Sequence, residues 1–266
     1  MIILIIGLMY KKGALYMNLR VIPNISERYK ALWVRGYDSL PKLIDYSNNP
    51  TLIITEHFKN ANRPALLVMG TDYGHSASTF FKNLDDDIHI ARDFNFTRGG
   101  GIVFGEGVYT IALHTPKFIS NIGEIFLECL QDKGIDAVAK NNDVMVKIDG
   151  KYKKVFGAAS IRWDNKQYTT TMLITVKAPI ELLRRYLRTD NFKFEDKPAF
   201  DDISDVVGGL LDVGLDESII DDFVVKIAEK YNYTIVPSEL TPEEIIACKE
   251  LYAQNPTTVK GVPIYD

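Results

Sequence analysis

The sequence predicts an α+β fold, with a mixed or antiparallel sheet flanked by helices and a small helical subdomain near the C-terminal end. Three observations lead to this fold class. Short runs rich in Val, Ile, Thr and aromatic residues alternate with helix-like segments over the first two thirds, and helices dominate the last third. No repeat of fixed period appears, which excludes solenoids and propellers. A length of 266 residues suits one large domain with a small appendage.

Strands are expected where a β-branched or aromatic run is bounded by Gly, Pro or Asn. Seven runs meet this description: Thr51–Thr55, Ala65–Gly70, Gly101–Phe104, Tyr109–His114, Val144–Ile148, Ala158–Arg162 and Thr170–Val176. Asp149 and Gly150 form a typical turn pair between the strand before them and a second strand that begins at Lys151. We therefore expect a hairpin across residues 144–159.

Four helices are predicted from the spacing of apolar residues and from their end signals. They are Lys117–Lys133, Ile180–Arg188, Ser218–Tyr231 and Pro242–Ala253. Gly134 is a suitable stop for the first helix, and Thr241 is a suitable N-terminal cap for the last.

The expected organisation is a main domain over residues 17–189, a small helical subdomain over 190–255 and a tail over 256–266. The stretch 190–205 is the most charged and least periodic part of the chain, and it is interpreted as the connector. A start at Met17 is favoured over Met1, with residues 1–16 read from upstream sequence; an N-terminal strand is the alternative.

Charge and cysteine content restrict the classes of partner and compartment. A formal net charge of -4 gives no basic footprint for nucleic acid. The apolar run at residues 1–9 is too short to cross a bilayer and lacks the features of a secretory signal. Cys129 and Cys248 stand alone, without zinc or disulfide spacing. We expect no nucleic-acid or membrane partner, and a cytoplasmic location.

A run of three glycines stands at the start of one predicted strand. Gly99, Gly100 and Gly101 allow a ligand to approach the backbone closely and leave N–H groups free for an anion. The guanidinium of Arg98 beside them suits a carboxylate or a phosphate. A plain glycine turn at a strand start explains the same residues, and in isolation it is the commoner explanation.

The predicted hairpin carries a second group of candidate residues. Lys151, Lys153 and Lys154 fall on its second strand, and Gly157 follows them. Solvated lysines on an exposed hairpin are the ordinary interpretation of such a cluster. A functional site requires one lysine to point at a ligand across Gly157, where the missing side chain leaves room.

Taken together, these segments resemble the lipoate–protein ligase branch of the biotin/lipoate ligase family. The resemblance rests on the order of four motifs: Gly99–Gly101, Asn142–Asp143, Lys154 followed by Gly157–Ala159, and the strand Thr170–Leu173. Residues 202–223 are similar to the closing subdomain of that family, and residues 240–252 to the helix that often follows it. The resemblance spans roughly residues 50 to 255.

The resemblance implies an ATP-dependent ligase that uses ATP and Mg²⁺. Lipoate, or a similar short acyl acid, would be activated as an acyl adenylate and passed to a lysine of a lipoyl-carrier-type protein. The catalytic role falls to Lys154, which would neutralise charge shared by the acyl carboxyl and the α-phosphate. Asp143 would also hold the metal. The binding residues that the resemblance implies are Arg98, Gly99, Gly100, Gly101, Asn142, Asp143, Gly157 and Ala158.

Three features of the chain depart from the pattern of the family. Asn95, Phe96 and Thr97 stand where two arginines are usual, Gly105–Glu106 where a His–Asp pair is common, and Thr169 where a strand histidine is frequent. Either Arg98, Lys151 and Lys153 compensate for the missing cations, or the enzyme uses another acid, or catalysis has been lost. The alternative function is a non-catalytic ligand- or carrier-binding protein on the same scaffold.

Two further points bear on the chemistry. Residues 178–200 contain no cysteine, which disfavours acyl transfer through a covalent thioester as in the related octanoyltransferases. The side chains of Val103, Phe104 and Met172 are candidates for the wall of an acyl slot, although the core is an equally good place for them.

Overall fold

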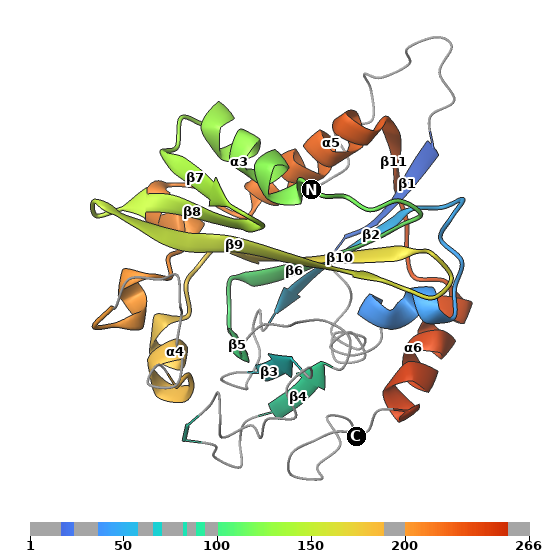
Figure 1. The fold of residues 1–266 in the computed structure, drawn as a ribbon, viewed down its shortest axis with the longest axis horizontal. Helices are drawn as coiled ribbons and strands as arrows, with labels where there is room; N and C mark the ends of the chain where they lie inside the picture. The colour runs from blue at the N-terminus through green and yellow to red at the C-terminus, as the bar shows by residue number, and fades with distance from the viewer. Residues whose placement is uncertain are drawn as a thin grey trace.

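The computed structural model describes residues 17–23, 37–57, 66–70, 82–83, 89–93, 101–188 and 200–254 of the chain. An eight-stranded sheet forms the main layer, and a three-stranded sheet lies on one side of it (Figure 1). The predictions about residues 1–16, Arg98, Gly99, Gly100 and the tail 256–266 lie outside the described residues.

The large sheet is mixed, as the sequence predicts. Its strand order is β11–β1–β2–β6–β10–β9–β8–β7. β1 pairs in parallel with β2 and β11, and the pairs from β2 across to β7 are antiparallel. The strands are β1 (Met17–Ile22), β2 (Thr51–His57), β6 (Val108–Thr115), β7 (Ala137–Lys140), β8 (Asp143–Ile148), β9 (Lys151–Arg162), β10 (Tyr168–Thr175) and β11 (Tyr233–Pro237).

The small sheet carries the last glycine of the predicted glycine run. Its order is β4–β3–β5, with β3 parallel to β4 and antiparallel to β5. The strands are β3 (Leu66–Gly70), β4 (His89–Asp93) and β5 (Gly101–Phe104).

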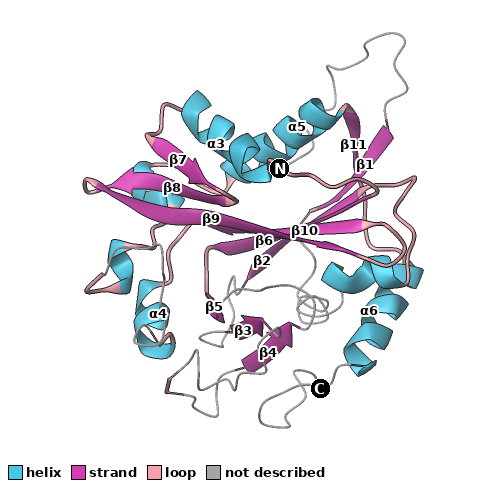
Figure 2. Cartoon of the chain, in the orientation of Figure 1, coloured by secondary structure: helices cyan, strands magenta, loops and turns pink. Residues whose placement is uncertain are grey.

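Helices cover both faces of the large sheet. α3 (Ile122–Asp132) and α5 (Ser218–Tyr231) lie on one face, and α4 (Ile180–Tyr186) and α6 (Pro242–Gln254) lie on the side of the small sheet (Figure 2). Three short 3₁₀ helices accompany them: η2 (Tyr37–Lys42), η3 (Ile203–Asp205) and η4 (Leu210–Val213). None of the helices in the described residues is long and apolar enough to cross a membrane.

All four predicted helices form, and their ends agree to within one residue except at two places. The first begins at Ile122 and not at Lys117, because the residues before it form a loop in which Phe118 is 53% exposed. The second ends at Tyr186 because Leu187 has an extended backbone. The predicted end signals hold, since Gly134 takes a φ of 76° after α3 and the Thr241 hydroxyl accepts a hydrogen bond from the Glu244 N–H.

The core lies mainly between the large sheet and the helix pair α3 and α5. Phe126, Phe156 and Phe223 meet there, with the rings of Phe126 and Phe156 stacked at 4.6 Å and Phe223 edge-on to both. One ring comes from each of α3, β9 and α5. Because large apolar side chains stabilise a fold in proportion to the surface that they bury, this cluster fixes both helices on the sheet.

Several short strands were not predicted from the sequence. β1, β4, β7 and β11 are missing from the expected set, and β11 falls in the stretch expected to be helical. β11 follows α5 directly through Asn232, whose φ of 54° provides the reversal without a Gly or Pro signal. The division at residue 190 stays a prediction; in the described residues α5 shares one hydrophobic cluster with α3 and the sheet.

Candidate active site

The face of the large sheet that turns toward β5 carries the candidate residues, and we call it the site face. Alternate residues of β6 and β10, such as Ile111 and Met172, pack with α3 and α5 on the other side. Ala112 and, in part, Leu173 pack on the site face with Phe104 of β5. β5, the strand that begins at Gly101, therefore lies over the same face of the sheet to which Gly157 and Asp143 belong.

One row of cross-strand partners runs over five strands of the site face. Its members, in order from β2 to β8, are Thr55, Thr110, Leu173, Gly157 and Asp143. The row changes from small and apolar groups in the middle of the sheet to a charged group at β8. The charged group is the Asp143 carboxylate, so positive charge for an anionic ligand must come from Lys154, which pairs with it.

The charged end of the row holds a lysine–carboxylate pair. The Lys154 Nζ lies 2.6 Å from Asp143 Oδ1, and the two side chains are 36% and 35% exposed. A Cβ built on Gly157 would lie 2.9 Å from both Cε and Nζ of Lys154 and 3.1 Å from Asp143 Oδ1. The Lys154 side chain therefore runs across Gly157, and only glycine leaves room for this path.

A β-bulge in β9 sets the direction of Lys154. The register of β8 and β9 shifts between Val144 and Met145, which leaves Val155 as an extra residue between Lys154 and Phe156. Bulges alter the direction in which neighbouring side chains point, and here the residue before the bulge reaches Asp143 on the next strand.

The remaining predicted site residues are placed as follows. Asn142 precedes β8 and its carbonyl accepts a hydrogen bond of 3.0 Å from the Ala158 N–H. The Ala158 side chain faces away from the site, because Ala158 pairs with Met172 and packs with α3 and α5. Gly101 begins β5 opposite Met69. Arg98, Gly99 and Gly100 lie outside the described residues.

The three residues considered for an acyl slot belong to the core. Val103 and Phe104 are almost fully buried in clusters with α4 and α6 respectively, and Met172 is fully buried on the helix side of the sheet. The slot interpretation is therefore wrong for Met172, since the alternation of β10 turns it away from Gly157.

Two threonines of the row were not among the predicted site residues. Thr55 is fully buried, and its hydroxyl has no hydrogen-bond partner among the described residues. Its cross-strand partner Thr110 is also buried. A buried hydroxyl without a partner is costly, so such a group is commonly matched by a ligand or a water. The only signal in the sequence was a threonine at an alternating position of an otherwise apolar strand.

The donor set suits a nucleotide and its magnesium better than a metal held by protein alone. No group of three or more His, Cys, Asp and Glu side chains in the described part of the chain could hold a metal ion. Asp143 supplies one carboxylate, and Mg²⁺ in nucleotide sites commonly takes one or two carboxylates with phosphate and water oxygens. Lys154 beside it supplies one ammonium for a phosphate or carboxylate oxygen.

A buried polar cluster occupies the far part of the site face. The Thr169 hydroxyl accepts a 2.8 Å hydrogen bond from Trp163 Nε1 and is bonded at 3.0 Å to His114 Nδ1. The His114 ring stacks on Tyr46 at 4.9 Å. Thr169, which stands where the related family often has a histidine, thus serves the packing of this end of the sheet.

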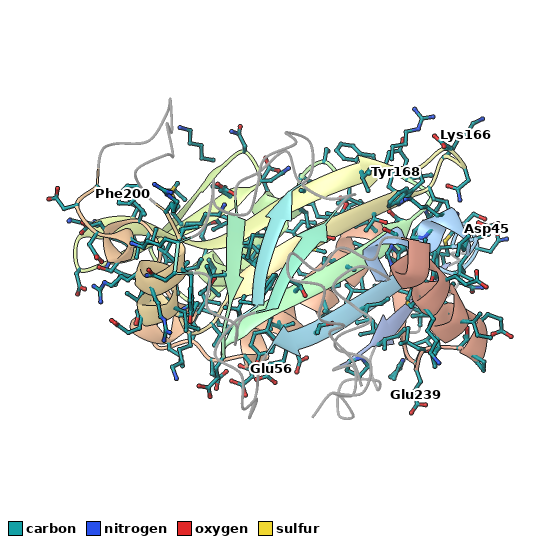
Figure 3. The ribbon with its side chains drawn as sticks, turned by 90° about the horizontal axis from the view of Figure 1, so that it is seen from below. Asp45, Glu56, Lys166, Tyr168, Phe200 and Glu239 are labelled. Atoms are coloured by element: carbon teal, nitrogen blue, oxygen red, sulfur yellow. The ribbon has the colours of Figure 1, made fainter. Side chains whose placement is uncertain are left out.

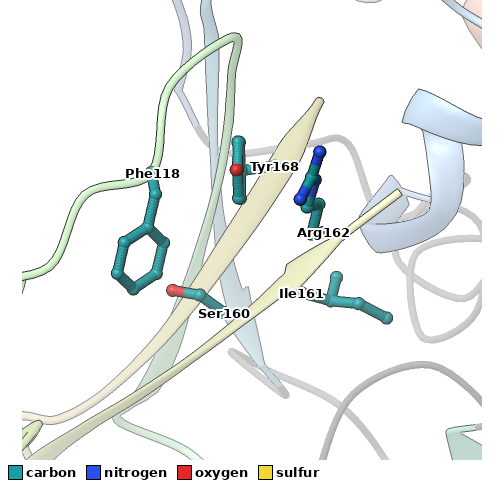
Figure 4. A pocket seen from close by; sticks show the side chains of 5 residues that line it. All are labelled: Phe118, Ser160, Ile161, Arg162 and Tyr168. Carbon is teal, nitrogen blue, oxygen red and sulfur yellow. The ribbon is translucent and has the colours of Figure 1, made fainter. Parts of the chain in front are cut away.

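A separate pocket lies at the β9–β10 hairpin and does not belong to the Lys154 site. It has a volume of about 300 Å³ and is lined by Phe118, Ser160, Ile161, Arg162 and Tyr168 (Figure 4). Ser160 is six residues along β9 from Lys154, which is roughly 20 Å in a strand. Figure 3 shows Tyr168 at one end of the sheet and Phe200, which packs beside α4, at the other.

Solved structures similar to this one are lipoate–protein ligases. No protein-family model and no curated protein matches the chain. A bipartite lipoate–protein ligase from Thermoplasma acidophilum, described with its E2 lipoyl domain, is 17% identical, with a TM-score of 0.68 over 90% of this chain and 92% of that chain. A putative lipoate protein ligase from T. acidophilum with bound lipoic acid is 16% identical, with a TM-score of 0.65 over 90% of this chain and 95% of that chain.

A third neighbour gives the same result. Lipoate–protein ligase A bound with ATP is 14% identical, with a TM-score of 0.67 over 90% of this chain and 95% of that chain. At such identities the likeness establishes the fold and leaves the chemistry to be argued from the residues. The protein described here therefore has the fold of the lipoate–protein ligases.

Proposed function

We propose that this protein is an ATP-dependent ligase that activates lipoate, or a similar short acyl acid, and attaches it to a lysine of a carrier protein. The observation that carries the proposal is the path of Lys154 across Gly157 to Asp143 on the site face. The fold supports it, since similar structures are described with lipoic acid, with ATP and with a lipoyl domain. The expected location is the cytoplasm.

The first step requires positive charge where anionic oxygens meet. A carboxylate oxygen of the acid attacks the α-phosphorus of ATP, and pyrophosphate leaves. Lys154, once its pairing with Asp143 is released, would neutralise the charge on the carboxylate and the α-phosphate together, as fixed cations do where negative charge develops. Asp143 would hold magnesium bound with the nucleotide, and that ion would supply further charge neutralisation on the phosphates.

The second step requires only access and positioning. The neutral amine of the acceptor lysine attacks the acyl carbon, AMP leaves, and the amine loses a proton as the amide forms. This transfer forms no bond to the protein, so a nucleophilic side chain is unnecessary. Both described cysteines are buried, and burial raises the pKa of the Cys129 thiol to about 12.

The acyl chain is proposed to lie over the part of the row that ends at Gly157 and Asp143. Gly157 and Ala159 on β9 are half-buried and small, whereas Ala112 is already covered by Phe104. A short apolar chain placed there would have its carboxylate at the ammonium of Lys154.

Adenylate formation tests the proposal directly. The protein is incubated with ATP, Mg²⁺ and lipoate, and mass spectrometry detects the acyl adenylate; a lipoyl domain is then added as acceptor. Lys154→Ala should lower the rate of adenylate formation about 100- to 1,000-fold, the size of losses seen when a fixed donor to a transition state is removed. Lys147→Ala is the matched control, because that lysine lies on the same hairpin and pairs with Asp136.

The same experiment decides the alternative of a non-catalytic binding protein. Asn95, Phe96 and Thr97, in place of the usual arginines, favour that alternative. If the wild type binds lipoate or ATP by calorimetry and forms no adenylate, the protein is a binding protein on a ligase scaffold.

A further inference from the structure

A short segment after the charged connector pairs with the backbone of Lys154. The Lys154 N–H donates to the Val206 carbonyl at 2.8 Å, and the Gly208 N–H donates to the Lys154 carbonyl at 3.1 Å. These bonds form an isolated parallel bridge between Lys154 and Val207. We call residues 202–209 the strap.

The strap replaces a neighbouring strand where β9 has none. β10 pairs with β9 only from Phe156 to Arg162. On the other edge, the bulge at Val155 interrupts the β8 ladder directly after Lys154. Without the strap, the backbone N–H and C=O groups of Lys154 would lose their hydrogen bonds to Val206 and Gly208, directly beside the bulge that orients the Lys154 side chain.

Two glycines allow the strap to approach this closely. A Cβ on Gly208 would lie 2.4 Å from Ile148 Cδ1 and 3.0 Å from Lys153 Cβ. A Cβ on Gly209 would lie 2.8 Å from the Val176 carbonyl oxygen and from the Ala178 nitrogen, which are backbone atoms and cannot move aside. The Gly208–Gly209 pair is therefore explained by the contact with β9 and the segment after β10.

Two ion pairs fix the other end of the strap. Arg184 of α4 donates to both carboxylate oxygens of Asp202, with Nε–Oδ2 and Nη2–Oδ1 distances of 2.9 Å. Lys151 donates to Asp205 Oδ1 at 2.7 Å. Asp202 and Asp205 also close a capping box around η3. The Arg184 fork holds the pKa of Asp202 well below its usual range.

The strap also connects Lys154 with the glycine-bearing strand. Ile203 is buried in one cluster with Val103 of β5 and with Leu183 of α4, and Val206 and Val207 pack against that cluster. One element therefore contacts both Lys154 and β5, the strand that begins at Gly101.

We infer that the strap is the positioning element of Lys154, held in place by the Arg184–Asp202 and Lys151–Asp205 pairs. This inference rests on the proposed function only for its kinetic consequence. Its structural consequence is that releasing the strap frees the backbone of Lys154 while the rest of β9 stays paired.

Hydrogen–deuterium exchange and kinetics test the inference together. In Arg184→Ala and Asp205→Asn, the amides of Lys154 and Gly208 should exchange at least about 10-fold faster, because local opening is easier once its contacts are removed. The Ala158 amide, bonded to the Asn142 carbonyl, is the internal control and should not change. Lys133→Ala is the control variant, since Lys133 pairs with Asp222 on the helix side.

The kinetic arm separates positioning from general stability. The kcat for adenylate formation should fall about 10- to 100-fold with little change in the KM for ATP, because small displacements of a catalytic group act mainly on the transition state. Arg184→Lys should recover part of this loss, since it keeps the charge and loses the fork.

Unchanged exchange at Lys154 in both variants would overturn the inference, as would wild-type kcat in a variant with a released strap. If the wild type forms no adenylate, the proposed function fails, and the exchange measurement alone still decides the role of the strap.

Discussion

At the scale of single residues, the candidate site consists of the Lys154 ammonium paired with the Asp143 carboxylate. Lys154 crosses Gly157 and ends on Asp143 at 2.6 Å. An incoming phosphate must compete with this carboxylate unless a metal ion draws the carboxylate away. Asp143 is therefore expected to act in opposite ways with and without Mg²⁺.

The variant Asp143→Asn tests this double role. Without Mg²⁺, ATP should bind up to about fivefold more tightly to the variant, which corresponds to the ~1 kcal/mol upper range of a partly exposed ion pair. With Mg²⁺, ATP should bind more weakly, because the oxygen ligand for the metal is reduced to an amide. Calorimetry with EDTA and with excess Mg²⁺ measures both affinities; equal changes under the two conditions would contradict the role of Asp143 as metal ligand.

At the scale of elements, α5 packs on the helix side of the sheet through a buried aromatic ring. Phe223 is fully buried between Phe126 of α3 and Phe156 of β9. Phe156 precedes Gly157, so this aromatic cluster supports the strand that carries the site from the opposite face.

Phe223→Ala should lower the free energy of unfolding by about 3 to 5 kcal/mol, the usual cost of deleting a buried ring. Phe118→Ala is the matched control, because Phe118 is 53% exposed, and it should cost less than about 1 kcal/mol. Urea unfolding followed by Trp fluorescence and by circular dichroism gives both values. A single shifted transition is expected; two separated transitions would show that residues 190–255 unfold independently of the sheet.

At the scale of the whole molecule, a buried ion pair joins the two ends of the described chain. Arg20 of β1 and Glu244 of α6 lie 2.9 Å apart, with side-chain exposures of 18% and 2%. The Tyr46 hydroxyl donates to the same carboxylate at 2.9 Å, and the Thr241 N–H donates to it at 2.8 Å. Burial raises the pKa of Glu244, but the hydrogen bonds from Arg20 and Thr241 outweigh it, so the pKa is lowered overall.

The sign of this shift sets a pH dependence. A carboxyl group with a lowered pKa in the folded state stabilises the fold above its unfolded pKa of 4.5, and this contribution is lost as the pH falls through the folded value. Glu244→Gln should cost about 2 to 3 kcal/mol at pH 7, somewhat less than the about 3 to 5 kcal/mol typical of breaking a fully buried pair, because Arg20 is partly exposed.

Urea unfolding between pH 3 and pH 7 measures this effect. The acid-induced loss of stability should be smaller in Glu244→Gln than in the wild type. Lys133→Ala, which breaks an exposed pair, should change the stability by less than about 0.5 kcal/mol at either pH. An unchanged pH profile in Glu244→Gln would contradict the assignment.

Much of the architecture could be predicted because it depends on local chemistry. The helix Ser218–Tyr231 agrees at both ends, since its apolar spacing is strong. The hairpin turn at Asp149 and Gly150 agrees as well, with φ values of 52° and 79°. β7 and β11 were missed because short strands at the edges of a sheet depend on the neighbour that they pair with.

The sequence by itself determined the fold class, the helices and the hairpin, because periodicity and turn residues act over a few neighbouring positions, whereas Lys154 was chosen among three lysines only through the family resemblance. Only the tertiary structure decided that Lys154 meets Asp143, that Ala158 and Met172 face the other side, and that the strap at Val206–Gly208 holds the lysine backbone. These contacts depend on a one-residue bulge in β9 and on pairing between segments about fifty residues apart. Neither leaves a periodic signal in the chain, since strand register is fixed by the packing of both faces of the sheet.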